Sequence, residues 1–298
     1  MDRISTAGSY SAILAGISSA QSRMATAQSQ ISSGELATDL KGYAPTADAL
    51  TAAKTVKARL DSYADSGSAL SDRLSAQAQA LDGVSQASTS ARQAVFKALA
   101  DGSGSTVMQE LQGWLGQASD ALNTNYQGQY LFSGGQSNTP PVKQPLDVSS
   151  LPPSPFQDGD LKSVSRLDDN LTIQTGQLAS DVGSKLYAAF QNLSQYVTSH
   201  YPATKQLPDP LTTDDITQLQ SSLGDFDAAQ AVVSDAVSQN GVNQNRVAAA
   251  QARITDQQSA ATSAISNMAD ADPAKAATDL QLAQTALQAS AQVFQTLK

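Results

Sequence analysis

Both ends of the chain carry apolar residues at alternating intervals of three and four, and this repeat constrains the fold more than any other feature. Near the start the repeat consists of Tyr10, Ile13, Ile17, Ala20, Met24, Ala27 and Ile31. Near the end it consists of Leu280, Ala283, Leu287, Phe294 and Leu297, with Ser290 as its one polar interruption. A seven-residue period keeps one stripe in register along two supercoiled helices. Because each stripe is too narrow to form a core alone, we expect the terminal helices to pair with each other and then with identical copies.

The same spacing continues inward from both ends. It predicts a long amphipathic helix over 60–98, which ends near the glycine-rich segment 101–104, and a shorter helix over 108–122. It also predicts helices over 186–197, 216–226 and 247–271. Thr212 and Asp215 have the spacing of a capping box, and Asp272 precedes Pro273 as an N-cap residue precedes a proline in the first helical turn. The second half of the chain therefore mirrors the first.

A segment of different character lies between these helical regions. Six of the eleven prolines fall between Pro140 and Pro155, and residues 128–169 show no helical period. Short alternating runs at 129–132 and 171–174 predict strands. We therefore predict a mainly α fold, in which both termini form a long antiparallel coiled-coil stalk and a small β-rich or mixed head is inserted in the middle. The expected domains are residues 1–40 with 265–298, residues 41–135 with 205–264, and residues 136–204.

Composition excludes several classes of partner. The chain has 18 basic and 27 acidic residues, a formal net charge of −9, and its basic residues are scattered singly. Nucleic acid and anionic membrane are therefore not expected as partners. The chain has no cysteine, and no stretch approaches the roughly 20 apolar residues that a transmembrane helix needs. The apolar run Ala12–Ile17 is also too short for a usual secretion signal, so we expect export without a cleaved signal peptide.

The sequence offers little for catalysis. The chain has one histidine, His200, which is expected in a solvated loop. The carboxylates of the chain are expected at helix caps or on solvated faces. Asp168, Asp169 and Asn170 favour a turn over a cation site, because they lack the ligand spacing of a calcium loop. We therefore expect no enzymatic activity, no metal and no cofactor.

Four short motifs carry a resemblance to a known family. They are Arg3-Ile4-Ser5-Thr6, the segment Gln30-Ile31-Ser32-Ser33-Gly34, the run Gly128-Gln129-Tyr130-Leu131-Phe132-Ser133-Gly134 followed by Asn138-Thr139-Pro140-Pro141, and Leu287-Gln288-Ala289-Ser290. In this order and at these distances from each end, they resemble the flagellin superfamily. Within that superfamily they are most similar to the third hook-associated protein, which forms the hook–filament junction.

This resemblance implies a structural role in the bacterial flagellum, outside the cell. It further implies type III export, a cytosolic export chaperone, assembly into a ring, and contacts with a neighbouring hook-associated protein and with flagellin. The filament subunit is the main alternative. A coiled-coil signalling or adhesin rod, and a bundle whose stripes pack only within one molecule, are further alternatives.

Assembly is expected to depend on the apolar stripes of the terminal helices. We expect these helices to be largely disordered in a free monomer and to become ordered when neighbouring copies cover their stripes. The predicted interface residues are Ile4, Ile13, Ile17, Met24, Ile31, Leu280, Ala283, Leu287 and Phe294.

Overall fold

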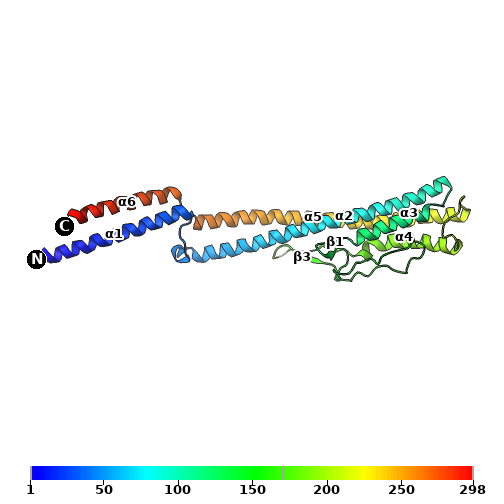
Figure 1. Ribbon diagram of the computed structural model, residues 1–298, viewed down its shortest axis with the longest axis horizontal. Helices are drawn as coiled ribbons and strands as arrows, with labels where there is room; N and C mark the ends of the chain where they lie inside the picture. Colours follow the sequence, from blue (N-terminus) through cyan, green and yellow to red (C-terminus); the bar gives the residue numbers. More distant parts are fainter. Residues whose placement is uncertain (1, 170, 297–298) are drawn as a thin grey trace. The chain divides into compact units, whose positions relative to one another are not determined.

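The computed structural model describes residues 2–169 and 171–296, with the backbone alone at residues 2–7, 9 and 296. The helices in these segments are α1 (Asp2–Ser33), η1 (Leu40–Tyr43), α2 (Ala47–Asp101), α3 (Val107–Leu122), α4 (Ala179–His200), α5 (Thr213–Ala269) and α6 (Pro273–Thr296). The strands are β1 (Asn125–Tyr126), β2 (Gln129–Tyr130), β3 (Val164–Arg166) and β4 (Thr172–Gln174). This arrangement, drawn in Figure 1, confirms the predicted mainly α fold with a small strand-containing region in the middle of the chain. Within the described segments, no helix has the length and apolar character that a membrane crossing requires.

The chain divides into two compact units. The first contains residues up to Ser62 together with residues from Ile254 onward, and the second contains Tyr63–Arg253. Helices α2 and α5 are long enough to contribute to both units. The three predicted domains, with boundaries near residues 40, 135 and 204, stay a prediction.

The second unit is organised around α2 and α5, which pair antiparallel. Arg92 of α2 forms an ion pair with Asp227 of α5, and the Gln230 amide donates to Ser85 Oγ over 2.8 Å. The predicted stripe of α2 forms the seam, and even its polar interruptions, Gln77 and Ser88, are buried. Apolar spacing therefore identified the buried face of α2 correctly.

Helices α3 and α4 complete the core of this unit. Phe190 of α4 meets Phe226 of α5 edge to face, with ring centroids 5.2 Å apart. Leu111 and Leu115 of α3 are buried in the same cluster. Val142, from the proline-rich segment, also belongs to it, so this segment covers the core although it forms little regular structure.

Two short β-hairpins form the strand-containing region. In the first, Asn125 pairs with Tyr130 around Gln127 and Gly128, whose φ angles are 51° and 83°. Two successive residues in the left-handed region are the geometry of a tight two-residue hairpin turn. In the second hairpin Val164 pairs with Gln174. Strands were predicted in both places, but they are shorter than the predicted runs.

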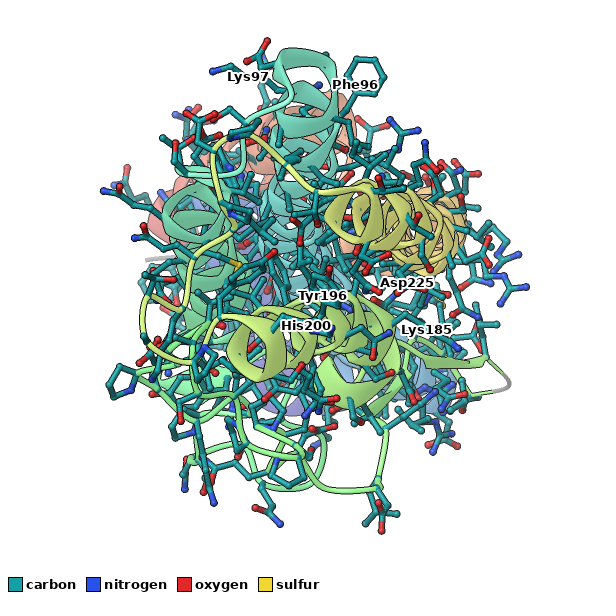
Figure 2. All side chains as sticks on the ribbon, turned by 90° about the vertical axis from the view of Figure 1, so that its right-hand side faces the viewer. Phe96, Lys97, Lys185, Tyr196, His200 and Asp225 are labelled. Atoms are coloured by element: carbon teal, nitrogen blue, oxygen red, sulfur yellow. The ribbon has the colours of Figure 1, made fainter. Side chains whose placement is uncertain are left out.

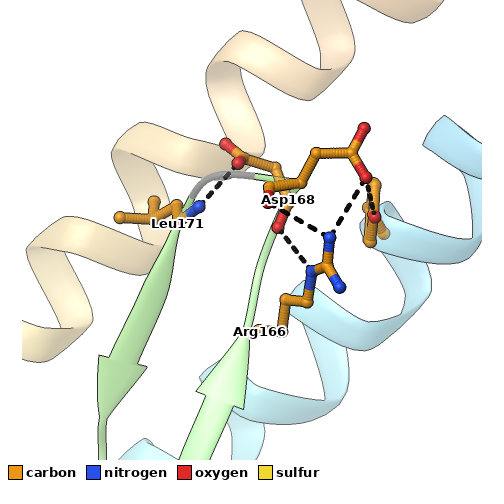
Figure 3. Close-up of polar contacts among 5 residues, drawn as sticks. Arg166, Asp168 and Leu171 are labelled. Atoms are coloured by element: carbon orange, nitrogen blue, oxygen red, sulfur yellow. Dashed lines mark hydrogen bonds and ion pairs between the residues drawn. The ribbon is translucent and has the colours of Figure 1, made fainter.

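Figure 3 shows the turn between β3 and β4, where the sequence offered a choice between a turn and a cation site. The Asp168 carboxylate accepts from the Leu171 amide over 2.8 Å, and the Arg166 guanidinium donates to the carbonyl oxygens of Asp168 and Asp169. The Tyr63 hydroxyl of α2 donates to Asp169 Oδ1 over 2.8 Å. Asn170 lies outside the described residues. The carboxylates thus hold the turn in shape and attach it to α2.

The junction between α4 and α5 is closed by one buried carboxylate. The Thr212 amide donates to Asp215 Oδ2 over 2.9 Å, and the Asp215 amide donates to Thr212 Oγ1 over 3.2 Å, which is the predicted capping box. The hydroxyls of Tyr196 and Tyr201 also donate to Asp215, over 2.9 Å each. Burial alone would raise the pKa of Asp215, but these hydrogen bonds outweigh it and lower the pKa below its usual value. Asp215 is therefore at the predicted helix cap, and it is fully buried there.

His200 is the last residue of α4 and does not lie in the loop where it was expected. Its ring stacks on that of Tyr196 with ring centroids 4.2 Å apart, and Nδ1 lies 3.0 Å from the Tyr196 carbonyl oxygen. Figure 2 labels both residues. A histidine suits the last turn of a helix because it pairs with unsatisfied carbonyl groups there. The side chain is exposed, as the sequence indicated.

Candidate assembly interface

Helices α1 and α6 lie side by side in the first unit and run in opposite directions (Figure 1). Tyr10, near the start of α1, meets Phe294, near the end of α6, edge to face with ring centroids 5.3 Å apart. A Cβ placed on Gly16 would lie 3.9 Å from Ser290 Oγ, so the polar interruption of the α6 stripe faces a residue without a side chain. The predicted pairing of the terminal helices is therefore present within one molecule, where both helices are formed although they were expected to be largely disordered without neighbouring copies.

The seam between α1 and α6 buries small side chains and leaves large ones incompletely covered. Ala20, Ala27, Ala276 and Ala283 are each no more than 3 % exposed. The larger residues of both stripes are only partly buried; they are Tyr10, Ile13, Ile17, Met24, Leu280, Leu287 and Phe294. Two helices cannot enclose a large side chain, because each stripe is wider than the line along which the helices touch. The pair therefore retains apolar surface along both edges of its seam.

Further apolar residues of these helices lie outside the seam altogether. Leu14 is 55 % exposed, Leu282 63 % and Val293 48 %. These residues fall outside the seven-residue repeat, so they were not among the predicted interface residues. Their apolar character at exposed helix positions was the available signal, since a solvated helix face is usually polar.

The predicted interface residues occupy three kinds of position. Ile13, Ile17, Met24, Leu280, Ala283, Leu287 and Phe294 lie on the facing sides of the two helices. Ile31 is 47 % exposed, because the antiparallel register places it opposite the first residue of α6, Pro273, where the partner helix only begins. The side chain of Ile4 and the whole of Leu297 lie outside the described residues. That these residues form contacts between copies stays a prediction.

Backbone hydrogen bonds hold the α1–α6 pair together at its base, the end where α1 finishes and α6 begins. Gly34, with φ of 75°, ends α1, and its carbonyl accepts from the Ala271 amide over 2.8 Å. The Leu36 amide donates to the Ala269 carbonyl over 2.7 Å. Asp272 caps α6 as predicted, because its carboxylate accepts from the Ala274 amide over 2.8 Å, with Pro273 between them.

A small apolar cluster supports this base. Tyr43, Leu50 and Ala269 are buried together, and the Tyr43 hydroxyl donates to the Ala37 carbonyl over 2.7 Å. Tyr43 is the last residue of η1, whose start is capped by the Asp39 carboxylate. The segment between α1 and α2 is thus held against the end of α5.

Charge is divided unequally between the two units. Residues 1–62 and 254–298 contain eight basic and nine acidic side chains, which gives a net charge of −1. Residues 63–253 contain ten basic and eighteen acidic side chains, which gives −8. The unit that contains the apolar seam is therefore almost neutral, and copies can approach through it without strong electrostatic repulsion.

Comparison with known families matches both ends of the chain. Residues 4–137 match the model of the bacterial flagellin N-terminal helical region, and residues 223–298 match that of the bacterial flagellin C-terminal helical region. Together these matches include more than half of the chain and contain α1, α6 and most of α5. No curated protein sequence matches the chain.

Solved structures with a similar fold include two flagellar proteins. One, from Vibrio parahaemolyticus, is described as a flagellar hook-associated protein; it is 16% identical with a TM-score of 0.61, over 74% of this chain and 96% of that one. The other is FlgL of Bacillus cereus, 16% identical with a TM-score of 0.52, over 67% of this chain and 98% of that one. At this identity the comparisons establish the fold.

Proposed function

This chain belongs to the bacterial flagellin family, and we propose that in the flagellum it joins the hook to the filament. Family membership makes it a structural component of the flagellum. The junction assignment is supported by the similar fold of the Vibrio hook-associated protein and of FlgL. It is also supported by the run Tyr130-Leu131-Phe132-Ser133-Gly134 with Thr139-Pro140-Pro141, which resembles junction proteins more than filament subunits.

The incompletely covered seam of α1 and α6 is the observation that carries the proposal. Each partly buried leucine or isoleucine of the seam gains about 1 kcal/mol when a neighbouring copy removes its remaining apolar surface from water. Several such residues per copy supply enough free energy to hold neighbours together. Terminal helices from successive copies thus complete a core that one molecule leaves open, and the resulting ring transmits torque by packing.

The proposed role is mechanical and not catalytic. Copies are exported without cleavage of a signal peptide, accompanied in the cytosol by a chaperone that covers the same apolar stripes. In the assembled ring, one face contacts a neighbouring hook-associated protein and the other contacts flagellin. Most side chains of α1 and α6 are exposed or only partly buried, which supports this order of events. A helix pair with so little buried surface opens readily for passage through a narrow channel.

Deletion of the gene, followed by electron microscopy and analysis of the medium, tests the junction role. We expect hooks without filaments and flagellin released into the medium, because filament subunits would have no ring on which to polymerise. Persistence of full-length filaments on the deletion strain would refute the role. If the chain is instead the filament subunit, its own band will dominate preparations of sheared flagella from wild-type cells, and the medium of the deletion strain will contain no flagellin.

A further inference from the structure

A solvent-open cavity of about 300 Å³ lies in the second unit, and none of its lining residues belongs to α1 or α6. It is bordered by α2, by the β1–β2 hairpin and by β3. Its lining residues are Ser66, Ala69, Leu70, Arg73, Tyr126, Gln127, Gln129, Leu131 and Ser165. Leu70 and Leu131 are buried and supply an apolar wall, and most of the other residues carry polar groups. A concave site with an apolar wall and a few polar groups is typical of small-molecule binding.

Arg73 is the one cation in this lining, and it has no carboxylate partner among the described residues. Its guanidinium makes a single long hydrogen bond, 3.5 Å from Nη2 to Ser163 Oγ. Burial lowers the pKa of Arg73, which means that the charged group has lost part of its hydration. Arginine stays protonated in proteins, so a poorly hydrated positive charge persists beside the cavity.

The second unit is rich in carboxylates, yet none of those described pairs with Arg73. The second unit has eighteen acidic residues, and some of its cations pair with them: Arg92 with Asp227, Lys162 with Asp181 and Arg166 with Asp169. A desolvated charge without a partner is unfavourable unless something pairs with it. Arg73 combines partial burial, a position beside an open cavity and donors without a carboxylate partner among the described residues, which is the arrangement expected of a group that binds a ligand.

The donors of the cavity select the class of ligand. The planar guanidinium fork matches a carboxylate, to which it donates two parallel hydrogen bonds. The Tyr126 hydroxyl accepts from the Gln127 amide over 3.3 Å and donates to no described acceptor, so its proton is free for a ligand oxygen. The exposed Gln129 amide offers both a donor and an acceptor. A single cation in a unit of net charge −8 favours a monoanion over a phosphate dianion.

We propose that this cavity binds a small polar ligand that bears one carboxylate, with the Arg73 guanidinium as its anchor. The carboxylate belongs either to a free acid or to an acidic side chain of another polypeptide. The expected affinity is in the millimolar range, because one charge-assisted contact must overcome the negative potential of the unit.

Nuclear magnetic resonance of the full-length chain, labelled with ¹⁵N, tests the proposal. The backbone amides of Gly128 and Gln129 report on the cavity while glucuronate, acetyl-aspartyl amide, acetate or inorganic phosphate is added at constant ionic strength. We expect saturable shifts with the carboxylates at about 10 mM or below, and at least a tenfold weaker response to phosphate. A stronger response to glucuronate identifies a free acid as the ligand, and a stronger response to acetyl-aspartyl amide identifies a polypeptide.

Two pairs of variants make the test specific. Arg73→Gln should weaken carboxylate binding at least tenfold, whereas Arg246→Gln, which removes an exposed arginine of α5, should leave binding unchanged. Ala69→Trp should obstruct the cavity without altering Arg73, and Ala100→Trp, on an exposed turn of the same helix, is its control. Thermal unfolding confirms that each variant is folded. Equal binding by wild type and Arg73→Gln, preference for phosphate, or no saturable shift in the wild type would each overturn the proposal.

Discussion

Replacement of Ala283 by aspartate tests whether the α1–α6 seam holds the terminal helices together. Ala283 lies near the middle of the seam and is 3 % exposed. Ala289 lies on the same helix but faces solvent. The variants Ala283→Asp and Ala289→Asp therefore introduce the same residue into the same helix and differ in whether the new carboxylate is buried.

The expected penalty follows from the burial of Ala283. Full burial raises the pKa of a carboxyl group by up to about 3–5 units, and each unit corresponds to about 1.36 kcal/mol. At pH 7 the aspartate would therefore cost about 4 kcal/mol in the closed seam, because a carboxyl whose pKa rises above 7 is protonated and its penalty stops growing. The seam itself consists of alanines and partly buried larger residues, and its net stability after the loss of chain entropy is on the order of a few kcal/mol. The cost of burying the aspartate is at least as large as the net stability of the seam, so the α1–α6 pair should open.

Hydrogen exchange followed by mass spectrometry measures the opening. In Ala283→Asp, amides of α1 and α6 should exchange about 10³-fold faster than in the wild type, since each 1.36 kcal/mol is a factor of ten. Amides of α3 and α4, whose core lies in the other unit, should be unaffected. Ala289→Asp should behave as the wild type. If α1 and α6 of Ala283→Asp keep the wild-type exchange rate, the seam does not hold these helices and the reasoning is wrong.

Three further outcomes are expected in the second unit. Asp215→Asn should lower the free energy of unfolding by about 2–4 kcal/mol near pH 7, because the hydrogen bonds to the charged carboxylate are lost. Since the folded-state pKa of Asp215 is depressed, its contribution is present above about pH 4 and is lost as the pH falls further; urea unfolding that weakens equally in both proteins below pH 4 would contradict this. Burial raises the pKa of Tyr187 to about 12, so its contribution should be complete below pH 10 and lost between pH 10 and 12, and the alkaline loss measured by circular dichroism should be smaller in Tyr187→Phe. Gly134→Ala should destabilise by more than about 1 kcal/mol, because φ is 61° and the new Cβ would lie 2.4 Å from the Gly159 carbonyl oxygen; Gly113→Ala, on an open helix face, should be neutral or stabilising, and similar melting temperatures for the two variants would disprove the argument.

Features that depend on periodicity were predictable from the sequence. The stripes of α1, α2, α5 and α6 identified the buried faces, because a repeat of three and four determines which side of a helix is apolar. Local capping chemistry was equally readable, as Thr212 with Asp215 and Asp272 with Pro273 show. These patterns are complete within a few turns of one helix, so no tertiary information is needed to recognise them.

Features that depend on contacts between distant segments were not predictable. Arg73 lines a cavity only because the β1–β2 hairpin and β3, which follow α2 by many residues, return to its side. The burial of Asp215 requires Tyr196 and Tyr201 from the end of α4. Ile31 continues the repeat but is exposed, because the repeat does not reveal where the partner helix begins. In each case the residue's role is decided by where a second element ends or turns.

Because charge is divided unequally between the two units, copies of the chain should repel one another at long range and attract one another at short range. At physiological ionic strength electrostatic repulsion extends about 8 Å, so two Tyr63–Arg253 units at net charge −8 resist close approach. The nearly neutral unit adds no such resistance and attracts once its apolar edges touch. Dilute copies should therefore remain dispersed, and attraction should dominate only where copies are held close together. Added salt should lower the protein concentration at which association begins.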